Sequence, residues 1–256
     1  RQRHPMQDHG KFGADAVRYW AGRARLGVDT ALDEQVFKVG KRLCTKLFNA
    51  SKFVIERFTG IDPAALTPAA ISCESDRAAI AQLRPLIRRA TAAFDEFDYA
   101  QALQLTEEFF WATFCDNYIE LAKPRTYDEG LTEGKLSAAA TLRVIHRALV
   151  RMFAPFLPFL AEEIWHWTYS VDPGMHASVH RSPWPALDEL AAIAEPKSAR
   201  TWPLTLLVAE SVRKAKADAN LSIKAPVRRV AVACNPEDAA ALDHAVLDIT
   251  RMLSIN

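Results

Sequence analysis

Apolar side chains recur through most of this chain at the spacing of amphipathic helices. They fall at i, i+3, i+4 and i+7, and clusters of glycine, proline and polar residues separate one periodic segment from the next. Asp33 stands where an N-cap is expected, immediately before the second segment. The pattern predicts helices over residues 13–26, 34–58, 75–97, 99–123, 136–153, 160–169, 204–220 and 237–253.

The first six of these helices are joined by connections that suit antiparallel neighbours. We therefore expect a mainly α protein, with an antiparallel helical bundle over residues 13–186. The segment 99–123 is apolar on nearly every side, which predicts a central position in the bundle.

The pattern changes after residue 186. Residues 187–202 read as a linker, and "VRRVAVAC" at 227–234 is the one segment typical of a strand. Because a single strand cannot form a sheet, residues 203–256 are expected to be part of a small α/β domain whose partner strands lie beyond Asn256. Residues 1–12 likewise read as a linker from an upstream domain.

Charge is unevenly distributed, although the net charge is only +1. Residues 1–60 hold 12 Lys or Arg against 6 Asp or Glu, and residues 200–230 hold 7 against 2. A solvated charged face is the usual explanation for such segments. Two basic stretches on an otherwise acidic chain also suit a docked polyanion.

Several function classes find no support in the motifs. No apolar run is long enough to span a membrane and no signal peptide is visible, so a soluble, cytoplasmic protein is expected. The histidines and the four cysteines are too scattered for a metal site or a disulfide framework, so we predict reduced, mostly buried thiols and no metal. Nucleotide-binding and nucleophile motifs are missing, so we expect neither catalytic residues nor a cofactor in this chain.

The predicted helix 34–58 has two contrasting faces. One is apolar and comprises Val36, Val39, Leu43, Leu47, Ala50 and Val54. The other carries hydrogen-bond donors, cations and one ring, namely Lys38, Arg42, Asn49 and Phe53, flanked by Gln35 and Lys46. Unpaired RNA bases are recognised by such a combination, because rings stack on bases while lysine and arginine hold phosphates. The alternative from the residues alone is that Phe53 packs against another helix.

Several motifs resemble the anticodon-binding region of class I aminoacyl-tRNA synthetases, most closely the valyl-tRNA synthetase family. They are "GADAVRYWAGRARLGVDTALDEQ", "KLFNASKFV", "FFWATFCDNYIELAKPR", "APFLPFLAEEIW", "SPWP" and "ESVRKAKADANLSIKAPV", and together they cover almost the whole chain. The "GADAVR" opening occurs across several class I families, whereas "ARLGVDT" and "KLFNASKFV" are more specific to the valyl type.

The resemblance implies a function in tRNA recognition. It implies that Lys46 donates hydrogen bonds to the anticodon and that Phe53 stacks on a base; Lys38, Arg42 and Asn49 join them from helix geometry alone. Arg213, Lys214 and Lys216 either touch the tRNA backbone or form a solvated helix end. The implied partner is tRNA(Val), and the implied oligomeric state is a monomer.

The resemblance also implies what this chain leaves out. Neither "HIGH" nor "KMSKS" appears, so the catalytic domain with its ATP site and the editing domain would belong to other parts of a parent chain. Two further readings remain open, namely a stand-alone RNA-binding regulator related to the synthetases and a non-catalytic helical scaffold.

Overall fold

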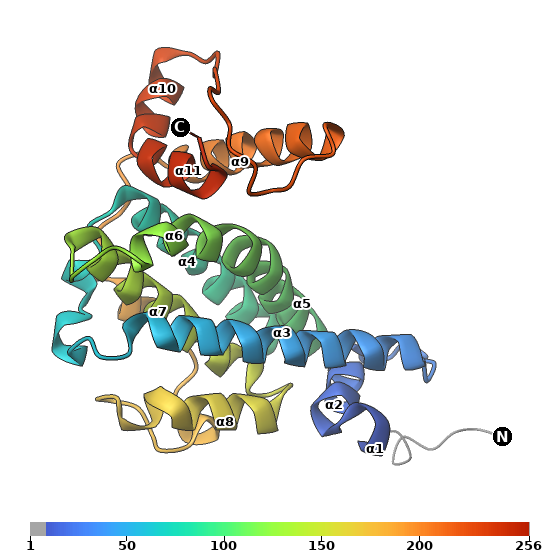
Figure 1. Ribbon diagram of the computed structural model, residues 1–256. Coiled ribbons are helices and arrows are strands. Elements are labelled where there is room, and N and C mark those ends of the chain that lie inside the picture. Colours follow the sequence, from blue (N-terminus) through green and yellow to red (C-terminus); the bar gives the residue numbers. More distant parts are fainter. Residues whose placement is uncertain (1–8, 256) are drawn as a thin grey trace. The chain divides into compact units, whose positions relative to one another are not determined.

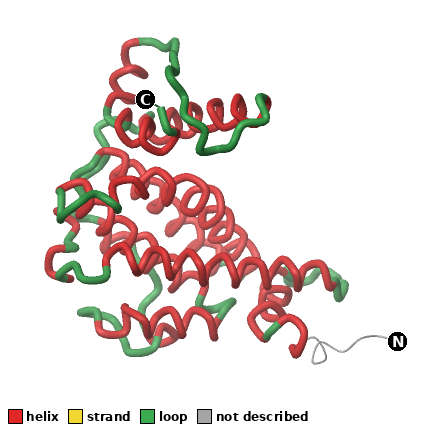
Figure 2. The backbone as a smooth tube through the Cα atoms, viewed as in Figure 1, coloured by secondary structure: helices red, strands yellow, loops and turns green. Residues whose placement is uncertain are grey.

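The computed structural model describes residues 9–255, and regular structure in this part of the chain is helical (Figures 1 and 2). The α-helices are α1 (His9–Phe12), α2 (Ala14–Arg23), α3 (Glu34–Phe58), α4 (Glu74–Asp95), α5 (Tyr99–Glu108), α6 (Ile119–Thr126), α7 (Glu133–Phe153), α8 (Pro158–Thr168), α9 (Thr201–Asp218), α10 (Pro236–Asp243) and α11 (Val246–Leu253). Single 3₁₀ turns occur at Pro63–Ala65, Pro68–Ala70, Tyr169–Val171, Val179–Arg181 and Leu187–Leu190. The predicted mainly α class is confirmed.

Two segments predicted as single helices are not single α-helices in the structure. The segment predicted as one helix over 99–123 runs through α5, a π-helix at Phe109–Tyr118 and α6. The last helix, predicted over 237–253, is interrupted at Ala245. Because α10 packs on α9 while α11 packs on both α9 and α6, one straight helix would not reach all three contacts.

One compact unit comprises residues 9–59, 85–110 and 143–189 of the described chain. The "GADAVR" motif acts inside it as a tether between α2 and the start of α8. The Asp15 carboxylate accepts hydrogen bonds from the backbone N–H of Leu160 at 2.8 Å and of Phe159 at 3.3 Å, and so caps α8. Arg18 donates to the carbonyl of Pro155 at 2.9 Å.

Helices α2 and α3 approach each other closely in this unit. A Cβ built on Gly40 of α3 would lie 2.8 Å from Tyr19 Cδ1 and 3.1 Å from the carbonyl oxygen of Ala16. Glycine is therefore the residue that allows this contact. The Tyr19 hydroxyl donates to Glu107 Oε2 at 2.7 Å and accepts from Arg23 at 2.7 Å, which fixes its ring.

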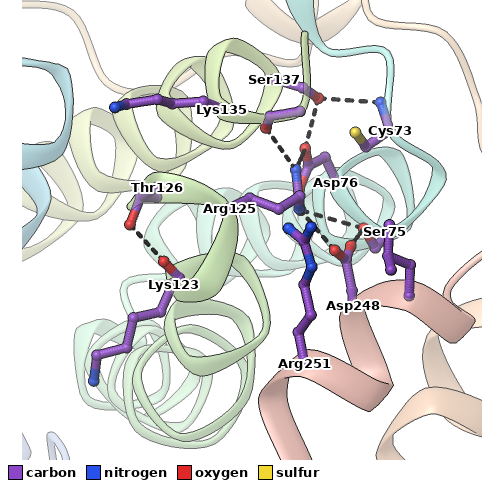
Figure 3. A network of polar contacts seen from close by, with 12 residues as sticks. Cys73, Ser75, Asp76, Lys123, Arg125, Thr126, Lys135, Ser137, Asp248 and Arg251 are labelled. Atoms are coloured by element: carbon purple, nitrogen blue, oxygen red, sulfur yellow. Dashed lines mark hydrogen bonds and ion pairs between the residues drawn. The ribbon is translucent and has the colours of Figure 1, made fainter. Parts of the chain in front are cut away.

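A second compact unit comprises residues 60–84, 111–142 and 190–255. At its centre Asp76 of α4 is fully buried and receives two hydrogen bonds from Arg125 of α6, at 2.7 and 2.9 Å (Figure 3). Tyr118 donates to Asp76 at 2.8 Å, and Arg125 also pairs with Asp248 of α11 at 2.8 Å. Breaking one partner of a buried pair leaves an uncompensated charge, so this network holds α11 against α4 and α6.

The strand predicted at 227–234 does not form. Within the described residues this segment makes only an isolated parallel bridge, between Val227 and Ile255, and most of its side chains are exposed. Its pattern suits a strand, but the described chain offers no second strand to pair with it. The α/β part of the prediction is therefore not visible. Of the linker predicted at 1–12, residues 1–8 lie outside the described residues and residues 9–12 form α1.

Candidate nucleic-acid interface

Helix α3 carries the candidate interface, and it forms as its sequence predicts. The Asp33 side chain accepts a hydrogen bond from the backbone N–H of Gln35 at 2.8 Å and so caps the first turn. Its buried face comprises Phe37, Gly40, Leu43, Leu47, Ala50, Ser51, Val54 and Phe58. The sequence expectation put Val36 and Val39 on this face, whereas both are half-buried. Phe37 takes the buried place, because the rings of Phe12 and Trp20 pack on it at 5.6 and 5.7 Å.

The five predicted anticodon-binding residues lie together on α3, away from the centre of its buried face, and we call them the α3 band. Its members are Lys38, Arg42, Lys46, Asn49 and Phe53. Lys38, Arg42 and Asn49 are exposed, whereas Lys46 and Phe53 are half-buried. Helix geometry explains the difference, since Lys46 and Phe53 are seven residues apart and follow one stripe along the border of the buried face.

Phe53 has a cationic neighbour. The Arg57 guanidinium lies 5.0 Å from the centroid of the Phe53 ring, within the range of a cation–π contact. This contact orients the ring on the helix surface. A half-buried ring held in place beside lysine, arginine and asparagine offers a stacking surface with donors on either side.

The rotation of α3 about its axis is fixed from behind by a buried hydrogen-bond chain. Ser51 of α3 donates to the carbonyl of Leu47 at 2.7 Å, so its oxygen accepts from Nε2–H of the fully buried His146 at 2.7 Å. The other ring nitrogen, Nδ1, then accepts from the Tyr169 hydroxyl at 2.7 Å. Burial lowers the pKa of His146 to about 3, so the ring is neutral in this chain of donors and acceptors.

The second predicted group of basic residues, on α9, does not form one exposed surface. Lys216 is buried, and its ammonium donates to the carbonyls of Ile223 and Leu253, both at 2.8 Å. Arg213 is half-buried and donates to Asn117 Oδ1 at 2.9 Å and to the carbonyl of Asp116 at 3.0 Å. Lys214 alone of the three is exposed. The α9 cations thus serve the internal contacts of the second unit, with Lys214 as the remaining candidate for a backbone phosphate.

Metal sites, disulfides and membrane-spanning helices were also considered for residues 9–255. No group of three or more His, Cys, Asp or Glu side chains is arranged to hold a metal ion there. The cysteines are free thiols, and the expectation that they are mostly buried is wrong, since only Cys115 is buried and Cys234 is exposed. None of the helices described is both long and apolar enough to cross a membrane.

Sequence reasoning missed the polar residues that act from inside. His146, Asp76 and Arg125 come from periodic helical segments in which each reads as an ordinary polar residue. The side chains that they contact lie at least 23 residues away along the chain, so no local sequence spacing indicates these contacts. The one sequence signal that could have found them is a histidine or a charged residue at a position that helical periodicity assigns to the apolar face.

Comparison with known proteins identifies the family of this chain. Residues 76–232 match the family model described as the anticodon-binding domain of tRNA ligase. The chain therefore belongs to the family of anticodon-binding domains of tRNA ligases.

Its curated relatives are valine–tRNA ligases, which confirms the resemblance to the valyl-tRNA synthetase family. The enzyme of Thermobifida fusca is 46% identical over 228 residues, which is 89% of this chain and 25% of that protein. That of Leifsonia xyli is 42% identical over 243 residues, or 93% of this chain and 27% of the relative. This chain thus spans about a quarter of the length of these relatives.

A solved structure shares the fold. It is the ternary complex of the LeuRS from Agrobacterium radiobacter K84 with tRNA and LeuAMS, with a TM-score of 0.54 and 21% sequence identity. The match covers 75% of this chain and 22% of that chain.

Proposed function

We propose that this chain is the part of a valine–tRNA ligase that reads the anticodon of tRNA(Val). The observation that carries the proposal is the α3 band, which puts three exposed polar side chains and a ring held by Arg57 on one helix of a chain in the anticodon-binding family.

The band supplies the chemistry that reading unpaired bases requires. The Phe53 ring stacks on a base that has left the anticodon stack, and the Lys46 ammonium and Asn49 amide bond to base edges. Lys38 and Arg42 neutralise phosphates of the same strand, which positions the RNA without reading its sequence. Lys214 on α9 is the remaining candidate contact to the tRNA backbone.

Catalysis belongs elsewhere in this proposal. Attachment of valine, with its ATP, and editing are performed by catalytic and editing domains outside these 256 residues. The parent enzyme works in the cytoplasm as a monomer, and anticodon recognition helps to place the tRNA 3′ end in its active site.

The test is equilibrium binding of the whole chain to a tRNA(Val) transcript and to the same transcript with a changed anticodon. The proposal predicts that changing the anticodon weakens binding at least about tenfold, since each mismatched contact to a base edge or stacked ring contributes on the order of 1–3 kcal/mol. Equal affinity for both transcripts would exclude anticodon reading. No binding to either transcript would favour the scaffold alternative.

A further inference from the structure

A cleft lies beside the N-terminal half of α3. Residues 24–31 of the loop that joins α2 to α3 form one wall of this cleft, which has a volume of about 530 Å³. We call it the loop cleft. Trp20 lines it and donates its indole N–H to the carbonyl of Ala31 at 3.1 Å, which ties the loop down.

The lining combines apolar walls with polar groups. Val28, Val36 and Val39 supply apolar surface. The polar part of the lining includes the guanidinium groups of Arg23 and Arg25, the Gln104 amide and one carboxylate, that of Asp29. Arg23 is preorganised, because it donates to the Tyr19 hydroxyl at 2.7 Å and lies 3.7 Å from Glu107. Arg25 is exposed, and the described residues provide it with no ion pair. A flat apolar ring with an attached anion fits this combination.

An exposed aromatic residue stands next to the cleft. Phe97, in the turn between α4 and α5, is 77% exposed and has a φ of 59°, a left-handed conformation that bulky residues rarely adopt. It lines a smaller hollow of about 270 Å³, which shares Arg25 and Val28 with the loop cleft. The ring thus occupies a position where glycine is favoured and gains little burial in return.

The cleft continues the α3 band. Val39, Lys46 and Phe53 recur every seven residues, so they follow one stripe of α3 over a rise of about 21 Å. A single RNA strand laid along this stripe from Phe53 therefore arrives at Val39, which lines the loop cleft.

We propose that the loop cleft holds one unpaired nucleotide of the bound tRNA, with its phosphate facing Arg23 and Arg25 and with Phe97 stacking at the rim. This proposal rests on the function proposed above and adds a second nucleotide site to it. The guanidinium groups of Arg23 and Arg25 outnumber the single carboxylate of Asp29 in the lining. This surplus of positive charge and the continuity with the α3 band favour RNA over a protein segment as the occupant.

The first experiment fills the cleft and measures affinity of the whole chain for a tRNA(Val) transcript. Val28 is 63% exposed, so Val28→Trp should occupy the cleft without disturbing the core, and affinity should fall about tenfold. Val171→Trp is the matched control, because Val171 is 85% exposed and lies away from the cleft. Equal affinities of the two variants would overturn the proposal, and a protein segment as the true occupant would give that result.

A second pair of variants tests the polar lining. Gln104→Ala removes the amide and should weaken binding several-fold, whereas Gln101→Ala, on the same helix and outside the cleft, should not. Phe97→Gly should weaken binding while the melting temperature stays the same or rises, because the strained position then carries the residue it favours. A Phe97→Gly variant with undiminished affinity would contradict the stacking role.

Abasic nucleotides identify the occupant. When each unpaired position of the transcript is replaced in turn by an abasic nucleotide, the penalty of Val28→Trp should vanish at one position and persist elsewhere. A penalty that persists at every position would overturn the proposal. If the wild-type chain binds the transcript with the original anticodon more tightly than the changed one, but Val28→Trp leaves the affinity unchanged, only the cleft proposal fails. If the wild-type chain binds both transcripts equally, the proposed function fails, and the cleft proposal that rests on it fails with it.

Discussion

At the scale of single residues, substitution of Phe53 tests whether this position belongs to a binding surface or to the hydrophobic core. Phe53→Ala should cost about 1–3 kcal/mol of tRNA binding, which is the usual size of base stacking on a ring. The free energy of unfolding should change by much less than the 3–5 kcal/mol typical of a fully buried Phe, because this ring is only half-buried. Thermal melting and tRNA binding of the same variant separate the two roles. A variant that melts far earlier, or that binds tRNA(Val) as tightly as the wild type, would return the ring to the core.

Two lysines of α3 provide the matched comparison for this test. Lys46→Ala removes a member of the α3 band, and Lys52→Ala removes an exposed lysine of the same helix that does not belong to the band. A base-edge contact at Lys46 should weaken the cognate tRNA selectively, whereas a phosphate contact should weaken all RNAs and flatten the salt dependence. Lys52→Ala should do neither, since Lys52 lies beside the Phe48 ring at 5.7 Å.

His146 predicts a specific pH dependence of stability. Burial lowers the pKa of this histidine from 6.5 to about 3. Between these two pH values the unfolded chain binds a proton at His146 that the folded chain does not bind. The contribution of the neutral His146 ring to the free energy of unfolding is therefore fully present above about pH 6.5. It is lost as the pH falls, at about 1.4 kcal/mol per pH unit between about pH 6 and pH 4. Denaturant unfolding of the wild type and of His146→Gln across this range measures it. Identical slopes for the two proteins would contradict this role of the buried ring.

At the scale of elements, the contact between α2 and α3 depends on one missing methyl group. Gly40→Ala gains helix propensity of about 1 kcal/mol but places a Cβ 2.8 Å from the Tyr19 ring, which is held by hydrogen bonds to Glu107 and Arg23. Overpacking of this kind costs about 1–3 kcal/mol, so net destabilisation is expected. Gly10→Ala is the control, because nothing lies within 4 Å of a Cβ at that position. Equal melting temperatures of the two variants would contradict this prediction, because they would show that α2 and α3 accommodate the added methyl group without loss of stability.

The unpaired segment after α9 should be the least protected part of the second unit. Amides of residues 228–232 make no backbone hydrogen bonds within the described chain, whereas Phe109–Tyr118 is helical and includes the buried rings of Phe110, Phe114 and Tyr118. Native-state hydrogen exchange should therefore be much faster in the first segment. Comparable protection would mean that this segment pairs with another strand in solution.

Helix positions and the α3 band were predictable from the sequence because both rest on local periodicity. Asp33 marked the start of α3, and the apolar repeat marked half of its buried face, namely Leu43, Leu47, Ala50 and Val54. Phe37 was not predictable, because its burial depends on the rings of Phe12 and Trp20 arriving from another segment. Lys216 was misjudged for the same reason, since the carbonyls that receive its ammonium lie on segments that follow α9.

At the scale of the whole molecule, the central claim is that the α3 band meets the anticodon. Motif resemblance suggested it, whereas the family match spans residues 76–232 and does not reach α3. Which side of α3 faces RNA is therefore a claim about this chain. That side is defined by the exposed Asn49, which lies between Lys46 and Phe53 along the helix.

The most direct measurement is photo-crosslinking of tRNA(Val) to the whole chain carrying a photoreactive side chain in place of Asn49, followed by sequencing of the crosslinked nucleotide. The same side chain in place of the exposed His166 on α8 provides the control. The account predicts that position 49 crosslinks to nucleotides of the anticodon loop and that position 166 does not. Crosslinks from position 49 confined to another arm of the tRNA would contradict the account.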